Sequence, residues 1–426
     1  MVVSDVSSSP TEVSYTPMSD SSMKEPESDV GVVVAGALAV DFSCDYAPFS
    51  KGSNTIEPLA HTSNPAVITQ SLGGVAHNIA KAAHLLGGSV RLYSAVGDDF
   101  SGRASLSQLQ TEGMSTHGIS ILPGPARTAQ YVAVNNAHKD LALAMADMSI
   151  LETIPQVTVS ELASQVFQSS PLRSRPAVFV ADANWSSENL YTWLQAARDA
   201  SVTTMFEPVS TAKATRIYPA DVKDVLAQPL ADIITPNNHE LIALHNFAHQ
   251  GSHFDHPAWF SVIDALGIPP SGLRVPLAIA TSSDIVDQGI PQQAIKLLPF
   301  FPTILTKLGP QGVLMVKLLE AGAPELHDEG EKSYILARNM NGHASIGGLY
   351  VRLFSPERVL PPEGVVSVNG IGDTFCGALA VGLTSGNKVQ DIIDFAQRAA
   401  SLSLRSRESV SPELKSLKDE VAKLRK

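Results

Sequence analysis

The sequence predicts an α/β fold in which short strands and longer helices alternate around a mainly parallel sheet. From residue 31 onward, apolar runs such as "GVVVAGALAVDFS" and "VRLYSAVGDD" alternate with helical stretches such as "GGVAHNIAKAAHLLG" and "GRASLSQLQTEG". This alternation is typical of βαβ units. Several apolar runs also end in polar residues, which is where open α/β sheets carry their ligand-binding groups.

Further along the chain, the segments predicted to be buried strands are "AVFVADAN", "TTMFEP", "DIITPN", "TILTKLG" and "GVLMVKL". Residues 127–148 differ, because apolar and polar residues alternate there around the turn-like "NNAHKD", which predicts a hairpin suited to act as a lid. Residues 248–300 predict helices with long connections. Residues 320–363 mix acids, Gly and Pro, which predicts an irregular insertion.

The two ends of the chain differ from this pattern. Residues 1–29 are rich in Ser, Thr, Pro and acids, and lack the apolar centre of a signal peptide and the arginines of a transit peptide. We expect them to be a disordered tail. Residues 30–415 are expected to form one domain, and residues 416–426 a charged C-terminal tail.

The composition indicates a globular protein whose partner is a small molecule. The 426 residues are 44% hydrophobic and carry a formal net charge of −12, which disfavours a nucleic-acid surface. No apolar run approaches the length of a membrane span, so no membrane partner is expected. Cys44 and Cys376 are far apart and lack metal-ligand spacing, which fits a reducing, cytoplasmic location.

The segment "SVNGIGDTF" places an aspartate directly after two glycines. Gly370 and Gly372 permit a tight turn, and "DTFCGALAVGL" has the small and apolar residues of a buried helix. A glycine-rich turn that opens a helix points backbone N–H groups at an anion. Asp373 would repel a phosphate, but it could take the proton from a hydroxyl that attacks the phosphate. A simple helix cap is the equally supported alternative.

A second motif, "LGGVAHNIA", could bind hydroxyl groups at the start of a helix. Gly73 and Gly74 would let the backbone approach a ligand, and the Asn78 amide could bond its hydroxyls. Asp41 follows the first predicted strand and could accept two hydrogen bonds from a sugar diol. An ordinary turn or cap is the alternative for each of these residues, and it is favoured for a bare glycine pair.

Two later turns could serve a nucleotide. In "ITPNNHEL", Asn237 and Glu240 are suited to hold water around a magnesium ion, which keeps its waters and takes few protein carboxylates. In "TKLGPQGV", Thr306, Gly309 and Gly312 could contact a nucleotide. The alternatives are a capped helix for the first motif and a plain β-hairpin for the second.

Other strand ends offer weaker candidates for site residues, and the absence of known motifs disfavours several classes of enzyme. Asp182 and Glu207 also end predicted strands, where an ion pair or a cap is at least as good an explanation. There is no G-x-x-x-x-G-K-[ST] loop and no G-x-S-x-G elbow. No G-x-G-x-x-G follows the first strand, which weakens the case for a dehydrogenase.

Taken in order, these motifs resemble the ribokinase-like (PfkB-type) family of carbohydrate and nucleoside kinases across about residues 31–413. The resemblance implies a ribokinase-like three-layer α/β/α sandwich with a mainly parallel central sheet. It also implies a small β lid, with strands at about 40–70 and 126–148. Within the family, "LAVDFSCDY" and "HTSNPAVITQSLGGVAHNIA" are most similar to pseudouridine kinases, particularly the kinase half of fungal proteins that also carry a pseudouridine-5′-phosphate glycosidase.

The resemblance also implies a role for each motif. Asp373 would be the general base, and the N–H groups of Gly370, Ile371 and Gly372 would form an anion hole. The remaining roles are ribose binding by Asp41, Gly73, Gly74 and Asn78, nucleotide binding by Asn237, Thr306, Gly309 and Gly312, and magnesium binding through water by Glu240.

The expected reaction is ATP-dependent phosphorylation of the 5′-hydroxyl of pseudouridine, with ATP and Mg²⁺ required. A kinase for ribose, adenosine or another nucleoside is the alternative, and so is a non-catalytic sensor that keeps the fold. A homodimer formed through the lid is also expected. Many relatives have Asp-Thr where this chain has Ser367 and Val368. The resemblance therefore does not decide whether this loop binds a monovalent cation such as K⁺.

Overall fold

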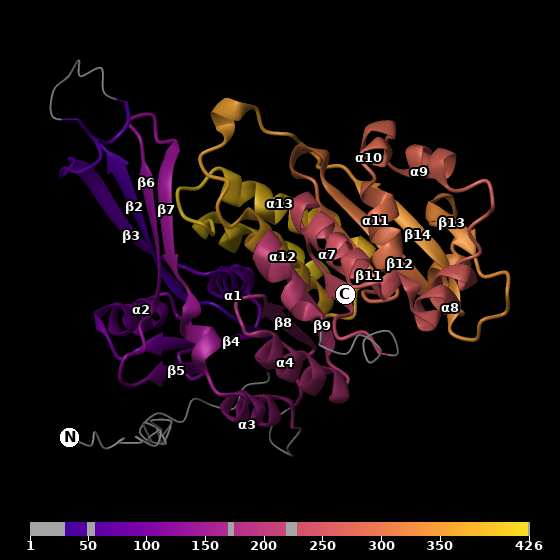
Figure 1. Cartoon of the computed structure of the whole chain (residues 1–426), viewed down its shortest axis with the longest axis horizontal. Coiled ribbons are helices and arrows are strands. Elements are labelled where there is room, and N and C mark those ends of the chain that lie inside the picture. Colours follow the sequence, from indigo (N-terminus) through magenta and orange to yellow (C-terminus); the bar gives the residue numbers. More distant parts are fainter. Residues whose placement is uncertain (1–29, 49–55, 169–173, 219–227, 425–426) are drawn as a thin grey trace, which may run out of the picture.

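The computed structural model describes residues 30–48, 56–168, 174–218 and 228–424 (Figure 1). The segment 1–29, for which the sequence predicts disorder, lies outside the described residues.

One large sheet runs through the described part of the chain. Its strands are β1 (Val32–Ala35), β4 (Val90–Gly97), β5 (Ile119–Leu122), β8 (Val178–Asp182), β9 (Thr203–Glu207), β10 (Ile233–Ile234), β11 (Thr303–Lys307), β12 (Val313–Glu320), β13 (Ile335–Arg338) and β14 (Ile346–Phe354). They lie in the order β13-β14-β12-β11-β10-β9-β8-β1-β4-β5. The strands from β11 to β5 pair in parallel, and β12, β14 and β13 pair antiparallel. The predicted α/β fold with a mainly parallel sheet is therefore confirmed.

Both faces of this sheet are buried, which explains the continuous apolar runs in its strands. In β1, Val33 and Ala35 pack into one hydrophobic cluster, whereas Val32 and Val34 pack into the other. Neighbouring residues of a strand point to opposite faces, so a run of small β-branched residues serves both clusters at once. The sheet is thus the middle of three layers.

Helices cover the two faces unequally (Figure 1). The face of Val32 packs against α1 (Val75–Leu85), α2 (Phe100–Thr111), α12 (Ile371–Leu383), α13 (Val389–Leu404) and α14 (Lys418–Leu424). The face of Val33 packs against α3 (Gln156–Phe167), α4 (Ser187–Asp199), α5 (Thr211–Ala214), α7 (Asn238–Gln250), α8 (Pro257–Ala265), α9 (Arg274–Ala280), α10 (Ser283–Asp287) and α11 (Ile290–Leu297). None of the helices in the described ranges is both long and apolar enough to cross a membrane.

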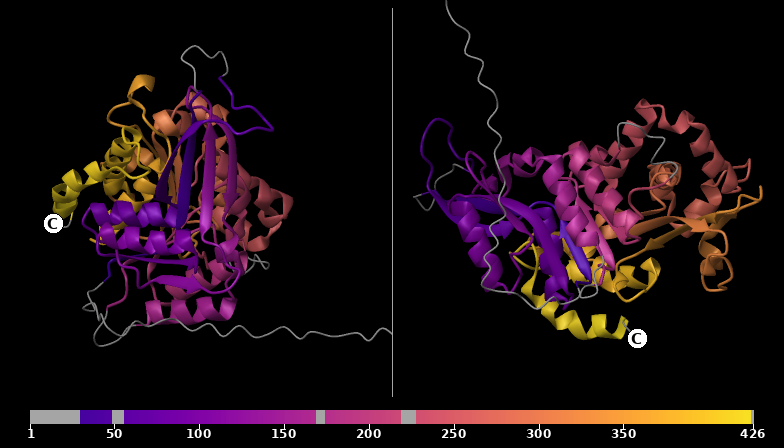
Figure 2. Two further views of the ribbon diagram at one scale, coloured as in Figure 1. Left: turned by 90° about the vertical axis from the view of Figure 1, so that its left-hand side faces the viewer. Right: turned by 90° about the horizontal axis from the view of Figure 1, so that it is seen from below.

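A second, smaller sheet projects from the end of the main sheet that carries β4 and β5 (Figures 1 and 2). Its strands are β2 (Ala39–Tyr46), β3 (Ala66–Gly73), β6 (Ala129–Asn135) and β7 (Leu141–Asp147), in the order β3-β2-β6-β7. The predicted hairpin is present, since β6 and β7 pair antiparallel. We call this sheet the lid.

The structure corrects the description of residues 320–363. They are not irregular throughout, because β13 and β14 extend the main sheet beyond β12. Glycine usually weakens a strand, so the pair Gly347 and Gly348 argued against a strand at β14 in the sequence. A side chain at Gly347 would overlap the carbonyl oxygen of Glu320, and one at Gly348 would overlap that of Ala337. These glycines are therefore needed for close approach of neighbouring backbones.

The charged end of the chain also has more structure than the sequence indicates. Residues 418–424 form α14, and its Val421 is buried in the hydrophobic cluster on the face of the sheet that carries Val32.

Candidate functional site

The helix predicted after the glycine-rich turn is present as α12, and Gly370 is its N-cap. Gly370 has a left-handed backbone with φ of 72°, and a side chain there would overlap the carbonyl oxygen of Ser409. Only glycine satisfies both conditions at low cost. The N–H groups of the first turn have no acceptor inside the helix and carry the positive end of its dipole, so the turn can hold an anion.

No strand directly precedes this turn. Residues 365–368 form no strand, and the N–H group of Val366 instead donates to the carbonyl oxygen of Leu404 at 2.7 Å. The turn is therefore anchored to the end of α13 and not to the sheet.

Asp373 lies in the first turn of α12 and is partly buried. The side-chain amide of Asn78 donates to Asp373 Oδ2 at 2.8 Å. Burial raises the pKa of Asp373 to about 7, and the nearby Glu207 carboxylate adds to the rise, while Asn78 and Lys307 oppose it. A carboxylate with this pKa can take up and release a proton near neutral pH, which is what a general base requires.

Asn78 is presented by α1, which begins directly after Gly74. Gly74 has a φ of 91°, and a side chain there would overlap the carbonyl oxygen of Ala37. The buried carboxylate of Asp182 accepts hydrogen bonds from the N–H groups of Ala37 at 2.9 Å and Ala76 at 3.0 Å. Asp182 thereby ties the start of α1 to the segment after β1.

One polar atom of Asn78 is left available. Its Oδ1 atom is buried and has no hydrogen-bond partner among the described residues. A buried acceptor without a partner costs free energy, so this atom is suited to accept a hydrogen bond from a ligand hydroxyl.

Asp41 lies at the base of the lid, on β2, beside Gly73 of β3. A side chain at Gly73 would overlap the Asp41 carboxylate, so glycine makes room for it. Burial raises the pKa of Asp41 to about 6. Asp41 faces Ser71 of β3 and Tyr131 of β6 across the lid strands. It is therefore placed where the lid meets the domain.

A cavity of about 550 Å³ opens on the other side of α12. Its lining includes the predicted residues Asn237, Glu240, Gly309, Gly312, Ile371 and Gly372. Apolar side chains line the rest, among them Val313, Val359, Leu360, Phe375 and Leu404. An apolar chamber with a few polar groups at one end suits a nucleotide, whose base is flat and whose phosphates are charged.

Thr306 is not among the residues that line this cavity. It is fully buried within β11, and its hydroxyl has no partner among the described residues. Strand alternation instead places the next residue, Lys307, in the lining. The predicted glycines Gly309 and Gly312 line the cavity, but the strand before them presents Lys307 and not Thr306 to it.

Asn237 and Glu240 open α7 with a reciprocal capping box. The Glu240 N–H donates to Asn237 Oδ1 at 3.0 Å, and the Asn237 N–H donates to Glu240 Oε2 at 2.8 Å. The capping alternative is therefore real, but it does not exclude a role in the cavity. Burial and the neighbouring Glu207 carboxylate raise the pKa of Glu240, which indicates excess negative charge at this end of the cavity.

Lys307 and Glu207 complete this end of the cavity, and neither was predicted from the sequence to belong to the site. Lys307 Nζ lies 2.9 Å from Glu207 Oε1 and 2.8 Å from Oε2. The available signal was a lysine directly before the L-G-x-x-G turn. The sequence alone does not indicate a role for this lysine, because its partner Glu207 lies 100 positions away in the chain.

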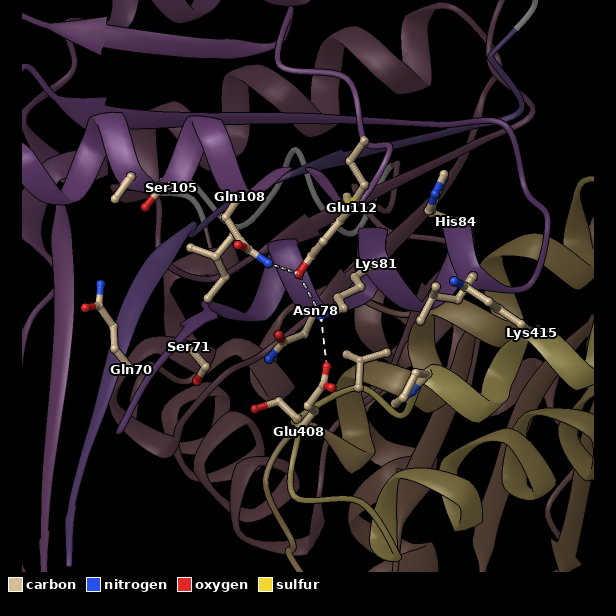
Figure 3. A pocket seen from close by; sticks show the side chains of 17 residues that line it. Gln70, Ser71, Asn78, Lys81, His84, Ser105, Gln108, Glu112, Glu408 and Lys415 are labelled. Atoms are coloured by element: carbon tan, nitrogen blue, oxygen red, sulfur yellow. Dashed lines mark hydrogen bonds and ion pairs between the residues drawn. The ribbon is translucent and has the colours of Figure 1, made fainter. Parts of the chain in front are cut away.

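Another cavity, of about 660 Å³, lies beside Asn78 between β3, α1, α2 and residues 408–415 (Figure 3). Lys81 reaches across it to Glu112 at 3.1 Å and Glu408 at 3.3 Å. Figure 3 shows Gln108 joining the same cluster through Glu112. The cluster ties α1 and the end of α2 to the segment after α13.

The predicted residues therefore form a chain of contacts. Asp41 packs on Gly73, and Gly74 opens the helix that carries Asn78. Asn78 bonds Asp373, and Gly372 precedes Asp373 at the edge of the cavity that also holds Asn237, Glu240, Gly309 and Gly312. The residues expected to bind hydroxyl groups thus lie on one side of Asp373, and those expected to bind phosphate lie on the other.

Comparisons with known proteins show the family to which the chain belongs. Residues 32–257 and 348–416 match the family described as pfkB family carbohydrate kinase. The chain is 30% identical over 359 residues to a pseudouridine-metabolizing bifunctional protein of Schizosaccharomyces pombe, covering 84% of this chain and 44% of that protein. It is 34% identical over 155 residues to the pseudouridine kinase of Escherichia coli, covering 36% of this chain and 46% of that enzyme. The chain spans less than half the length of the curated relatives it matches.

Solved structures show the same fold at low sequence identity. Ribokinase from Cryptococcus neoformans in complex with ADP superposes with a TM-score of 0.57 at 18% identity, covering 92% of this chain and 100% of that chain. A Burkholderia thailandensis nucleoside kinase in complex with inosine gives a TM-score of 0.52 at 15% identity, covering 92% and 96%.

Proposed function

Because the chain belongs to the pfkB family of carbohydrate kinases, we propose that it transfers the γ-phosphoryl group of ATP to the 5′-hydroxyl of pseudouridine. The product is pseudouridine 5′-phosphate. The observation that carries the proposal is the placement of Asp373, which accepts a hydrogen bond from Asn78 at the start of a helix whose first N–H groups are suited to bind an anion. The choice of pseudouridine is supported by the relatives whose names carry that nucleoside.

On the acceptor side, Asp41, Asn78 and the glycine pair would hold the ribose hydroxyls. Asp41 offers a carboxylate at the base of the lid, and Asn78 offers its unpartnered Oδ1. These contacts would place the 5′-hydroxyl near Asp373. Fixing the acceptor in this way supplies a large part of the rate enhancement in phosphoryl transfer, since little other chemistry is needed from the protein.

Asp373 would then take the proton as the 5′-oxygen attacks the γ-phosphorus. The bond from phosphorus to the β,γ-bridging oxygen breaks, and ADP leaves. The N–H groups at the start of α12 would stabilise the charge on the transferring group. The lid would close over the sugar and exclude water, which could otherwise accept the phosphoryl group.

The residues at the end of the cavity fit a magnesium ion. Glu240 and Glu207 lie close enough for their charges to interact, and Glu240 is buried, so a bound cation would relieve their repulsion. Glu240 and Asn237 would hold the ion through water, and the ion would neutralise charge on the ATP phosphates. Pairing of two copies through the lid stays a prediction.

The test is ADP release by the purified chain with Mg-ATP against pseudouridine, uridine, adenosine, ribose and fructose, with the product identified by mass. Selective turnover of pseudouridine is the expected result. Turnover of another acceptor would keep the reaction and discard the substrate. No turnover with any acceptor, while nucleosides still bind, would instead favour a sensor.

A further inference from the structure

Lys307 occupies a position in the cavity that neither the sequence motifs nor the comparisons assign. It is the last residue of β11, and its N–H group donates to the carbonyl oxygen of Pro236 at 2.8 Å. The strand therefore fixes its backbone next to the start of α7. Its side chain lines the nucleotide cavity, and 17% of that side chain is exposed.

The ammonium group of Lys307 lies over Gly372. A β-carbon added to Gly372 would lie 3.0 Å from Lys307 Nζ. Glycine therefore keeps open a space that borders both Nζ and the first N–H groups of α12. An anion bound by those N–H groups would lie within reach of Nζ as well.

Glu207 holds the ammonium group in this place. Both of its carboxylate oxygens lie within 2.9 Å of Nζ, and its Oε2 also accepts a hydrogen bond from the Thr235 hydroxyl at 2.6 Å. Burial alone would lower the pKa of Lys307, but the carboxylates of Glu207 and Glu240 outweigh burial and raise it. The lysine is therefore a fixed positive charge.

A buried ion pair is a poor device for stability alone, because removing both charges from water costs about as much as their attraction returns. A cation fixed in advance at a site with little water stabilises developing negative charge far better than one in solvent. The Lys307–Glu207 pair has the features of such a device: burial, a bidentate clamp and a position beside the anion-binding turn.

We propose that Lys307 is a catalytic residue that contacts the transferring phosphoryl group, with Glu207 as its positioning residue. This inference rests on the proposed kinase function. As the bond from the γ-phosphorus to the bridging oxygen breaks and the bond to the acceptor oxygen forms, the proton passes to Asp373. Lys307 gives up no proton and neutralises negative charge on the phosphoryl oxygens.

The experiment compares Lys307→Met, Lys307→Arg and Glu207→Gln with a matched control, Lys317→Met. Lys317 lies on the neighbouring strand β12 at similar exposure, and its Nζ pairs with Glu325 at 2.9 Å. It does not line the 550 Å³ cavity. The readouts are kcat, KM for ATP, Tm, and binding of Mg-ADP with and without fluoroaluminate, which mimics the transferring group. Binding is measured without acceptor, so it does not depend on acceptor identity.

We expect Lys307→Met to lower kcat by about 10²- to 10³-fold, the range for removal of one donor that stabilises transition-state charge. Fluoroaluminate binding should weaken with it, while binding of Mg-ADP alone changes little. Lys307→Arg should recover part of kcat, because the charge is kept. Glu207→Gln should lower kcat less than Lys307→Met does, and Lys317→Met should change Tm without changing kcat.

The assignment would be overturned if Lys307→Met lowered Tm as Lys317→Met does but kept kcat and fluoroaluminate affinity within about threefold of the unmodified chain. The Lys307–Glu207 pair would then have a structural role only. Failure of the proposed function would show differently. The unmodified chain would then turn over no acceptor and bind Mg-ADP no more tightly with fluoroaluminate, and the Lys307 assignment would fall with it.

Discussion

Asn78 and Asp373 stand 295 positions apart in the sequence, yet the amide of one donates to the carboxylate of the other at 2.8 Å. The contact joins the helix that follows the glycine pair to the helix that follows the glycine-rich turn. Gly377 allows these helices to pack closely, since a side chain there would lie 2.5 Å from the carbonyl oxygen of Ile79. The two predicted parts of the site, one for the acceptor and one for phosphate, are therefore joined by packed helices and a side-chain hydrogen bond.

Asp373→Asn is expected to reduce kcat by about 10²- to 10⁴-fold, the contribution of a general base, while ligand binding is largely kept. The asparagine can still accept the hydrogen bond from Asn78, so the geometry should survive. Steady-state kinetics and calorimetric binding of the nucleoside check this. Asp391→Asn is the matched control, because Asp391 lies in the first turn of the neighbouring helix α13. Near-normal turnover in Asp373→Asn would remove this residue from the base role.

The rate should fall as the pH drops below about 7, because burial raises the pKa of Asp373 to about 7 and only the ionised carboxylate can accept a proton. Below about pH 6 the fall should steepen, since the pKa of Asp41 is raised to about 6 and its protonation removes an acceptor for the ribose hydroxyls. The profile of kcat/KM for the nucleoside, at saturating Mg-ATP, tests both steps. Asp41→Ala should keep the first step and lose the second, and a flat profile between about pH 5.5 and 8 contradicts the assignment.

Asp373→Asn should also raise Tm at about pH 8. The folded-state pKa of Asp373 lies above its ordinary value of 3.8. Its stabilising contribution is therefore fully present below that ordinary value and is lost as the pH rises through about 7. Asparagine resembles the protonated form and avoids the loss. Thermal unfolding across this range should show the gain in Tm shrinking as the pH falls, and an unchanged or lower Tm at about pH 8 would count against a buried, destabilising carboxylate.

Asp41→Ala should raise KM for the nucleoside with a smaller effect on kcat, because Asp41 would bind ribose hydroxyls without touching the transferring group. Gly73→Ala should act in the same direction, since its new methyl group would overlap the Asp41 carboxylate and displace it. KM for ATP is the internal control and should change little in both variants. An unchanged nucleoside KM in Asp41→Ala would rule out the sugar contact.

The sequence by itself determined the class of fold and the local parts of the site. Alternating apolar strands and helices gave the parallel sheet, and the pattern in residues 127–148 gave the lid hairpin. The turn at Gly370 could also be predicted, because glycine favours its left-handed backbone and the small apolar residues after it favour a buried helix.

Only the tertiary structure decided which of these parts meet. The packing of α1 against α12 brings Asn78 to Asp373, and the order of strands places Lys307 beside Glu207. The packing of β11 in the sheet buries the side chain of Thr306, while the side chain of the next residue, Lys307, lines the cavity. Strand and helix propensities depend on a few neighbouring residues. The contacts between distant residues depend instead on how helices and strands pack on the two faces of one sheet, and no short stretch of sequence specifies that packing.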